Sequence, residues 1–400
     1  MLAMKQLQEK WTSWMFDEAA PLWSSAGYHS DLGLFNEMLT FTGRAENPQG
    51  LRLMAQARQV SSFALLASFQ EGDEAWGDLA LSVMGRLEKL YHNRDGQKGW
   101  IFSLNQKQEI LEAKRDLYGH AFVLFAYASL GHLLKEKNSP AFQKFRQTSL
   151  CAGEEIFQLF GVEIAEGQFQ RFSEWREVLP YHGEHAQNPW MHLLEACLSL
   201  YEVYGDMIWQ QRAKEILKLF KTHLVAEKGL LPEKFDEHWQ ALEKAGQNSV
   251  EPGHLFEWSW LLGEACRLLD LEDFEVEALQ KIAQTFKEFA VQYGKSSQNP
   301  HWIVNAVLET GHEYNSAIRL WLQTEYLRLL ASSYTKGANE KILEKLQEQT
   351  EIFFEDFTPK RLKGGWIDRL NKNGNPESAL MPATSFYHIL SAVIAIKAIG

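Results

Sequence analysis

The chain alternates between two kinds of helical pattern. One kind repeats apolar residues at helical spacing and keeps one charged face, which predicts an amphipathic helix with a solvent-exposed side. The other kind is apolar around nearly its whole circumference and is broken only by small residues and histidine, which predicts a buried helix. The amphipathic segments are residues 5–19, 73–91, 141–160, 207–224, 272–292 and 338–356, and the apolar segments are residues 51–70, 117–134, 189–204, 254–269, 315–331 and 383–398.

Segments rich in glycine and aromatic residues lie between an amphipathic helix and the next apolar one. Residues 98–105 and 364–371 share a Gly-Trp-Ile core, and residues 229–239 and 167–175 are looser copies. A short β-hairpin fits each segment. Six helix pairs in 400 residues give a repeat that is longer than that of common solenoids. We therefore predict an all-α ring of helical hairpins, a single domain over residues 1–400, in which the inner helices begin at one mouth.

Composition narrows the classes of partner. The formal net charge of -12 argues against nucleic acid or an anionic membrane, and it favours a small uncharged ligand. Three widely separated cysteines, Cys151, Cys197 and Cys266, predict a reduced cytoplasmic setting. Residues 1–23 lack the apolar core of a signal peptide, and the apolar run over residues 121–134 is too short to span a bilayer. The sequence leaves a homodimer open.

Titratable residues gather near the predicted starts of the apolar helices. His254 and Glu257 follow a Pro-Gly pair and stand three residues apart, so they share one helical face. A histidine in such a helix is often a satisfied core group, but four histidines at one level of a ring favour a common pocket. The candidates at this level are Arg58, Asp116, His120, His192, His254, Glu257, Trp321, Glu325 and His388.

The surrounding motifs resemble the N-acylglucosamine 2-epimerase superfamily, which includes cellobiose 2-epimerases and mannose and sulfoquinovose isomerases. The resemblance covers essentially the whole chain and is greatest to the mannose isomerase branch. It implies an (α/α)6 barrel and chemistry that uses no metal and no cofactor. The motifs are the segment Arg-Leu-Met-Ala-Gln-Ala-Arg-Gln ending at Gln59, Gly119-His120-Ala-Phe, Asn188-Pro-Trp-Met-His192, Pro-Gly-His254-x-x-Glu257-Trp, Trp321-x-x-x-Glu325, Gly-Gly-Trp366 and Tyr387-His388.

The resemblance also implies roles for these residues. His254 and His388 would transfer protons, since an imidazole can donate and accept them near neutral pH. Glu257 would orient His254 and favour its protonated form, and Arg58 would bind the carbonyl or enediolate oxygen. The remaining substrate-binding candidates are His192, for hydroxyl binding or ring opening, Trp321 and Trp366, as apolar walls, and His120, Asp116 and Glu325.

The implied activity is interconversion of an unphosphorylated aldose and ketose, with D-mannose and D-fructose as the preferred pair. The proton transfer would pass through a cis-enediol or enediolate. A 2-epimerase acting on mannose and glucose, cellobiose or N-acylglucosamine would use the same two histidines.

Three further readings remain open at the level of sequence. His254 and Glu257 together with His192 could hold a divalent ion. A glycoside hydrolase would need two carboxylates flanking the scissile bond, for which Asp116 and Glu257 are the only obvious candidates. A binding module without catalysis would keep the same pocket.

Overall fold

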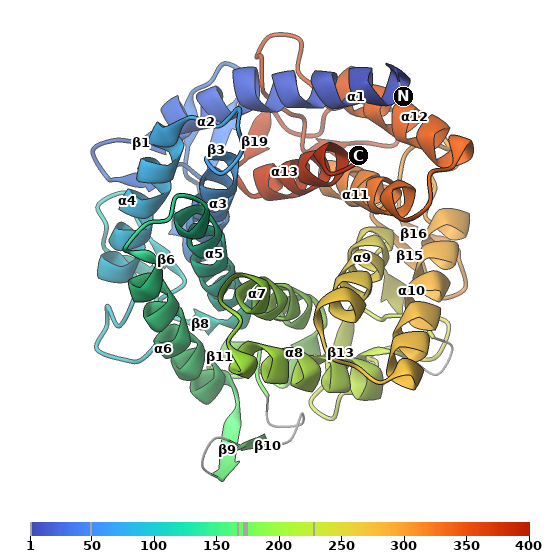
Figure 1. Cartoon of the computed structure of the whole chain (residues 1–400). Coiled ribbons are helices and arrows are strands. Elements are labelled where there is room, and N and C mark those ends of the chain that lie inside the picture. Colours follow the sequence, from blue (N-terminus) through green and yellow to red (C-terminus); the bar gives the residue numbers. More distant parts are fainter. Residues whose placement is uncertain (1, 49, 166–167, 171–174, 227–228) are drawn as a thin grey trace.

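Six inner and six outer helical segments form two concentric rings in the described part of the chain (Figure 1). This computed structural model describes residues 2–400 except residues 49, 166–167, 171–174 and 227–228. The inner ring consists of α3 (Leu53–Leu66), α5 (Leu117–Glu136), α7 (Asn188–Tyr204), α9 (Pro252–Leu268), α11 (Leu320–Lys336) and α13 (Thr384–Lys397). The outer ring consists of α1 (Leu2–Ser13), continued by η1 (Trp14–Ala19) and α2 (Ala20–Ser25), then α4 (Glu74–Leu90), α6 (Phe142–Phe160), α8 (Met207–Leu219), continued by η3 (Phe220–Leu224), α10 (Asp273–Tyr293) and α12 (Glu340–Asp356).

The ring closes where the end of the chain meets its beginning. The last inner helix, α13, packs against both α3 and α11, and α1 lies across α13 from outside. Inner helices therefore have neighbours on every side, while each outer helix buries one face. This confirms the predicted all-α fold, an (α/α)6 barrel.

The two predicted kinds of helix differ in burial as expected. In α3 nearly every side chain is buried, whereas α12 buries only Leu346, Gln349, Thr350 and Phe353. Helix α5 is 20 residues long and apolar enough to cross a bilayer by length and composition, so it exceeds the apolar run predicted above. Most of it is buried between α3 and α7, as is typical of a core helix.

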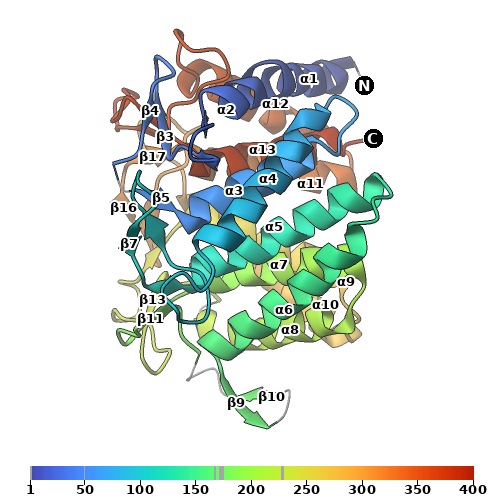
Figure 2. The same cartoon turned by 90° about the vertical axis from the view of Figure 1, so that its left-hand side faces the viewer.

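Short antiparallel strands gather at one end of the barrel (Figure 2). The pairs and sheets are β1–β2, β9–β10, β8–β11, β12–β13, β17–β18, β14–β15–β16, β3 between β19 and β4, and β6 between β5 and β7. The strands are β1 (Tyr28–His29), β2 (Leu34–Phe35), β3 (Met38–Thr40), β4 (Ala45–Glu46), β5 (Leu51–Arg52), β6 (Ser103–Leu104), β7 (Ile110–Glu112), β8 (Arg115–Asp116), β9 (Val162–Ala165), β10 (Gln168–Gln170), β11 (Val178–Leu179), β12 (Glu184–Ala186), β13 (Lys234–Asp236), β14 (Ser249–Val250), β15 (Ala306–Leu308), β16 (Glu313–Asn315), β17 (Ile318–Arg319), β18 (Arg369–Leu370) and β19 (Leu380–Pro382).

Most strands connect neighbouring loops, whereas β1–β2 and β9–β10 are isolated hairpins. Residues 98–105 supply β6, which pairs with both β5 and β7, and residues 364–371 supply β18, which pairs with β17. Within the looser copies, β13 pairs with β12, while residues 167 and 171–174 lie outside the described residues. The predicted helix 315–331 begins instead at Leu320, because β16 and β17 take up the residues before it. Pairing across loops holds the starts of successive inner helices at one level.

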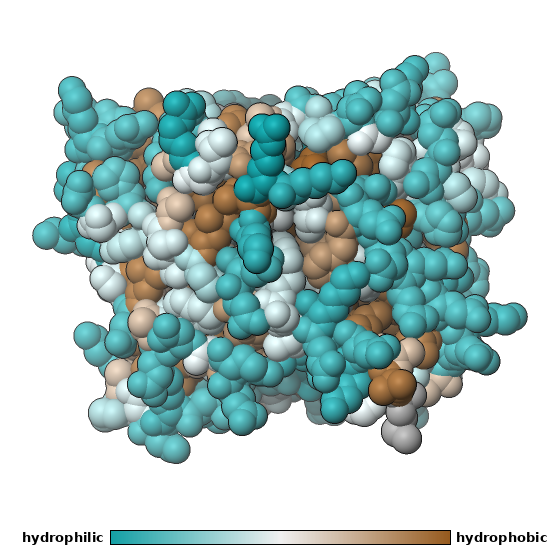
Figure 3. Space-filling model, turned by 90° about the horizontal axis from the view of Figure 1, so that it is seen from above, coloured by the Kyte–Doolittle hydropathy of each residue, from teal (hydrophilic) through white to brown (hydrophobic). Residues whose placement is uncertain are grey.

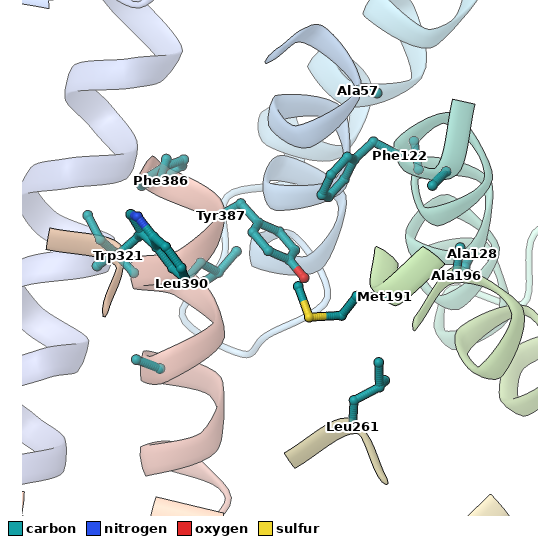
Figure 4. Close-up of a cluster of buried hydrophobic side chains, with 14 of the residues drawn as sticks. Ala57, Phe122, Ala128, Met191, Ala196, Leu261, Trp321, Phe386, Tyr387 and Leu390 are labelled. Atoms are coloured by element: carbon teal, nitrogen blue, oxygen red, sulfur yellow. The ribbon is translucent and has the colours of Figure 1, made fainter. Parts of the chain in front are cut away.

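Apolar side chains fill the centre of the barrel below this mouth (Figure 4). Phe122 of α5 and Tyr387 of α13 meet edge to face with ring centroids 5.4 Å apart, and the Tyr387 hydroxyl points towards Met191 of α7. On the face over α1, α2 and α12, apolar side chains appear in separate patches between polar ones (Figure 3). Most of the apolar surface that folding removes from water therefore lies between the two rings and inside the inner ring.

Close helix packing makes Gly131 of α5 sensitive to substitution. A β-carbon at Gly131 would collide with the Tyr204 ring of α7, whereas one at Gly85 of α4 would meet no atom within 4 Å. We expect Gly131→Ala to destabilise the protein by ~1–3 kcal/mol through overpacking. Gly85→Ala, the matched control, should stabilise it by ~0.5–1 kcal/mol because alanine favours the helix. Urea unfolding of both variants measures these changes in the free energy of unfolding. A Gly131→Ala variant as stable as Gly85→Ala would contradict the close contact between Gly131 and Tyr204.

Candidate active site

A cavity of about 180 Å³ opens at the mouth where the inner helices begin. This volume is below the ~300–1,000 Å³ of pockets that hold drug-sized ligands, so it suits one small polar molecule. All six inner helices contribute to its wall. The lining residues are Arg58, Tyr118, Asn188, His192, Glu251, His254, Glu257, Arg319, Trp321, Thr384, Ser385 and His388. Arg58, His192, His254, Glu257, Trp321 and His388 had been selected from the sequence, and the structure brings them together.

His254 is held as a cation by carboxylates from the loops beside α9. Its Nδ1 lies 2.9 Å from Oε2 of Glu233 and 3.6 Å from a carboxylate oxygen of Glu251. Burial alone would lower the pKa of His254, but the charges of Glu233 and Glu251 and the hydrogen bond to Glu233 raise it to about 9. His254 is therefore protonated at neutral pH and presents Nε2–H as a donor.

His388 has the opposite electrostatic environment. Its Nδ1 lies 2.7 Å from Oε1 of Glu325 on α11. Burial, and after it the positive charges of Arg58 and Arg328, hold the pKa of His388 well below its usual range. His388 is therefore neutral at neutral pH. The two imidazoles in one cavity thus differ by a proton.

Glu257 does not orient His254, contrary to the prediction. Both oxygens of the Glu257 carboxyl are buried without a hydrogen-bond partner in the described structure, and one of them lies 3.8 Å from Nδ1 of His192. Burial, with the negative charges of Glu325 and Glu195, raises the pKa of Glu257 well above its usual range. Glu257 is therefore a neutral carboxylic acid that can donate a hydrogen bond to a ligand. Glu233 takes the orienting role, because the loop before β13 reaches His254 from outside the helix.

His192 is also neutral. Its Nδ1 lies 3.2 Å from Oε2 of Glu195, one turn along α7. Burial lowers the pKa of His192 to about 4, although Glu195 opposes this shift. The other nitrogen, Nε2, is left to contact a ligand, as is the Asn188 Oδ1, which is buried without a partner among the described residues.

Arg58 supplies a positive charge that no carboxylate neutralises within ion-pair distance in the described part of the chain. One guanidinium nitrogen donates to the Tyr118 hydroxyl at 2.6 Å and another to the Thr384 carbonyl at 3.2 Å. The group also lies 4.2 Å from the centre of the Phe122 ring. Such a charge, fixed by neutral partners, is suited to a negatively charged or strongly polarised oxygen.

Trp321 forms a flat wall beside both titratable imidazoles. Its ring centroid lies 4.9 Å from that of His254 and 5.5 Å from that of His388. A β-carbon at Gly253 would lie 2.6 Å from the Trp321 ring, so glycine is needed for this close approach. The apolar face of a ligand can rest on this ring.

Three predicted site residues lie outside the cavity lining, in structural positions. Trp366 is fully buried and contacts the rings of both Trp23 and Phe386, at centroid distances of 5.2 and 5.7 Å, which fixes α2 against α13. Nε2 of His120 accepts a hydrogen bond from the backbone N–H of Trp100, 3.0 Å away, and burial lowers the pKa of His120 to about 3.

The third is Asp116, which caps the start of α5 through the Gly119 N–H. Its position just before an inner helix suggested the pocket, but that is equally the position of a helix cap. Glu325 also lies outside the lining, although it reaches the pocket through its contact with His388.

Several groups at the site were not selected from the sequence. Glu233 lies in a loop without a distinctive motif, so only the folded chain shows that it reaches His254. Glu251 stands three residues before His254, a helical spacing that could have indicated their contact. Arg319 ends β17 and lines the cavity, and Glu195 and Arg328 lie one helical turn beyond His192 and Glu325. The helical spacing of the last two was the only signal that could have found them.

Potential metal ligands fall into three groups within the described residues. They are His192 with Glu195 and Glu257, Glu233 with Glu251 and His254, and Glu257 with Glu325 and His388. His254 and His192, which the metal hypothesis combined, belong to different groups. In each group a carboxylate already holds a histidine nitrogen, whereas Glu257, which belongs to two of the groups, has no hydrogen-bond partner in the described structure.

The role of Glu233 can be measured by titrating His254 with NMR. We expect a midpoint near 9 in the natural protein. Glu233→Gln should lower it by more than about one pH unit, because it removes the nearest negative charge. Glu257→Gln should have a smaller effect, and Glu237→Gln, on the other side of β13 and 65% exposed, should have none. A Glu257→Gln shift larger than that of Glu233→Gln would restore the original assignment.

Comparison with known proteins is consistent with this geometry. A "Mannose-6-phosphate isomerase" of Rhizobium meliloti is 29% identical over 392 residues, covering 95% of this chain and 94% of that protein. A "Cellobiose 2-epimerase" of Dictyoglomus turgidum is 25% identical over 294 residues, covering 70% of this chain and 69% of that protein. A crystal structure of a D-mannose isomerase has the same fold, with a TM-score of 0.79 at 16% identity over 96% of each chain. The model of the N-acylglucosamine 2-epimerase family matches residues 33–392. The chain therefore belongs to this family of sugar isomerases and 2-epimerases.

Proposed function

We propose that this protein interconverts D-mannose and D-fructose through a cis-enediol or enediolate. The observation that carries the proposal is the pair of imidazoles with opposite protonation states in one small cavity. Aldose and ketose differ by the position of one carbon-bound hydrogen, so the reaction needs a base that removes a proton and an acid that returns one. His388 and His254 offer these two states at the same pH.

The reaction begins on the open-chain aldose. Nε2 of His388 takes the proton from C2, and the electron pair moves to form the C1–C2 double bond of the enediolate. Arg58 stabilises the negative oxygen, an electrostatic effect worth ~3–4 kcal/mol for a single well-placed donor in comparable sites. The imidazolium of His254 delivers its proton to C1, while the proton of the C2 hydroxyl moves to O1, and these transfers give the ketose. The proton taken from C2 stays on His388, and exchange with solvent restores the protonation states of both rings.

The remaining lining residues suit the other hydroxyl groups of a monosaccharide. Glu257, as a neutral acid, and Asn188, through its unpartnered Oδ1, offer a donor and an acceptor. His192 offers Nε2 for a hydroxyl group or for opening the pyranose ring. Trp321 would support the C–H face of the sugar.

The competing outcome is 2-epimerisation, in which the proton returns to the opposite face of C2. The relative named cellobiose 2-epimerase makes this a real alternative. The cavity of about 180 Å³ favours a monosaccharide over a disaccharide. Chromatography after incubation with mannose, mannose 6-phosphate or cellobiose distinguishes the substrates and products. We expect fructose from mannose, with activity unchanged by exhaustive chelation. If none of the sugars is converted, the protein would instead be a binding module without catalysis.

Removal of either imidazole should abolish most of the turnover. We expect His254→Ala and His388→Ala each to lower kcat by at least about 10²-fold with the fold intact, because each removes a proton-transfer group. His238→Ala is the matched control, since this side chain is 78% exposed. Steady-state kinetics with circular dichroism measures the effect. Near-normal turnover in a folded His254→Ala or His388→Ala variant would mean that the pair is wrongly chosen.

The pH profile of kcat/KM should have two limbs. On the alkaline side, activity should fall as pH rises through the pKa of His254, about 9, because the acid loses its proton. On the acid side it should fall when the coupled Glu325 and His388 gain a proton. Glu233→Gln should move the alkaline limb to lower pH. A flat profile between pH 5 and 10, or an alkaline limb unaffected by Glu233→Gln, would contradict the assignment.

A further inference from the structure

A buried arginine beneath the cavity connects the carboxylates that hold two of the pocket histidines. Arg328 of α11 does not line the cavity, and its guanidinium lies 3.4 Å from the centre of the Trp260 ring. One of its nitrogens is 3.4 Å from Oε2 of Glu325, and another is 3.0 Å from Oε1 of Glu195. The proposed reaction gives Arg328 no direct part.

Each of these carboxylates has its other oxygen on a pocket group. Oε1 of Glu325 lies 2.7 Å from Nδ1 of His388, while Oε2 of Glu195 accepts the Tyr387 hydroxyl and lies 3.2 Å from Nδ1 of His192. Helices α7, α11 and α13 are thereby joined by one charge network. A network of this kind inside a protein is stable only when each member has its partner.

The protonation of Glu325 decides what His388 can do. If Glu325 is ionised it can only accept, so Nδ1 of His388 carries the hydrogen and Nε2 keeps a free electron pair. If Glu325 is protonated it can donate to Nδ1, and the neutral ring then carries its hydrogen on Nε2. Only the first tautomer leaves Nε2 free to act as a base.

Burial is the largest effect on Glu325 and disfavours its charge, and Arg328 is the main group that opposes this effect. Burial and the neighbouring Glu195 raise the pKa of Glu325 to about 7, and Arg328 opposes both. Glu257 on α9 also lies in this cluster, while His192 and His388 face it from α7 and α13. Arg328 is thus the permanent cation within ion-pair distance of Glu325 among the described residues.

We propose that Arg328 is a positioning residue that keeps Glu325 ionised and thereby fixes His388 in the tautomer whose Nε2 can accept a proton. The part that concerns catalysis rests on the proposed role of His388 as the base. The tautomer itself does not depend on which sugar the protein converts. This separates a failure of the positioning role from a failure of the proposed function.

The test compares the full-length natural protein with Arg328→Met after labelling histidines with ¹⁵N. At pH 8, above the pKa of about 7 for Glu325, we expect NMR to show a mainly unprotonated Nε2 on His388 in the natural protein and a larger fraction of unprotonated Nδ1 in Arg328→Met. The acid limb of kcat/KM should move up by at least about one pH unit, a tenfold loss on the acid side. Arg328→Lys keeps the charge but loses the planar fork, so it should give a smaller shift of the acid limb. If Arg328→Met does not fold, the shift in Arg328→Lys tests the positioning role.

Arg212→Met is the matched control. Arg212 on α8 is also buried, lies 4.0 Å from the centre of the Phe157 ring, and pairs with Glu154 at 2.7 Å, but it does not contact the cavity. It should lose stability without changing the His388 tautomer or the acid limb. The proposal is overturned if folded Arg328→Met keeps Nε2 unprotonated and the acid limb in place. It is also overturned if Arg212→Met moves both as much.

Discussion

Each titratable imidazole of this pocket is paired at Nδ1 with a buried or half-buried carboxylate, and the properties of the site depend on these pairs. The charges of Glu233 and Glu251 keep His254 protonated beyond neutral pH, while Glu325 holds His388 in an environment that contains three arginines. The two histidines that contact the Trp321 ring therefore have different protonation states. A difference of this kind is set by neighbouring charges and burial, and it can be changed by one substitution.

The double ring of helices makes this pairing possible. The pocket groups come from all six inner helices, and the strands between neighbouring loops hold the helix starts at one level. Carboxylates reach the histidines from two directions, Glu233 from the loops at the mouth and Glu325 and Glu195 from below. The apolar layer around Phe122, Met191 and Tyr387 lies inside the barrel, which keeps the lower network out of water (Figure 4).

The fold could be predicted from the sequence because the pattern of apolar and charged residues in each segment indicates whether its helix is buried or partly exposed. The apolar and amphipathic segments differ along their whole length, so errors were limited to boundaries such as the start of α11. The pocket histidines could be found because they interrupt apolar helices. Asp116 and His120 gave the same signal, but their hydrogen bonds to Gly119 and Trp100 are structural. Partners such as Glu233 could not be found, because the contact joins residues 21 positions apart through a loop.

The central claim is that two imidazoles of opposite protonation move a proton at C2 of a hexose. Its most direct test is NMR of mannose incubated with the protein in D₂O. We expect fructose with deuterium at C1, in one of the two hydrogen positions, together with deuterium at C2 of the recovered mannose. Glucose labelled at C2 would reassign the outcome to epimerisation by the same pair. Fructose that retains the original C2 hydrogen without exchange, as direct hydride transfer would give, would contradict the account.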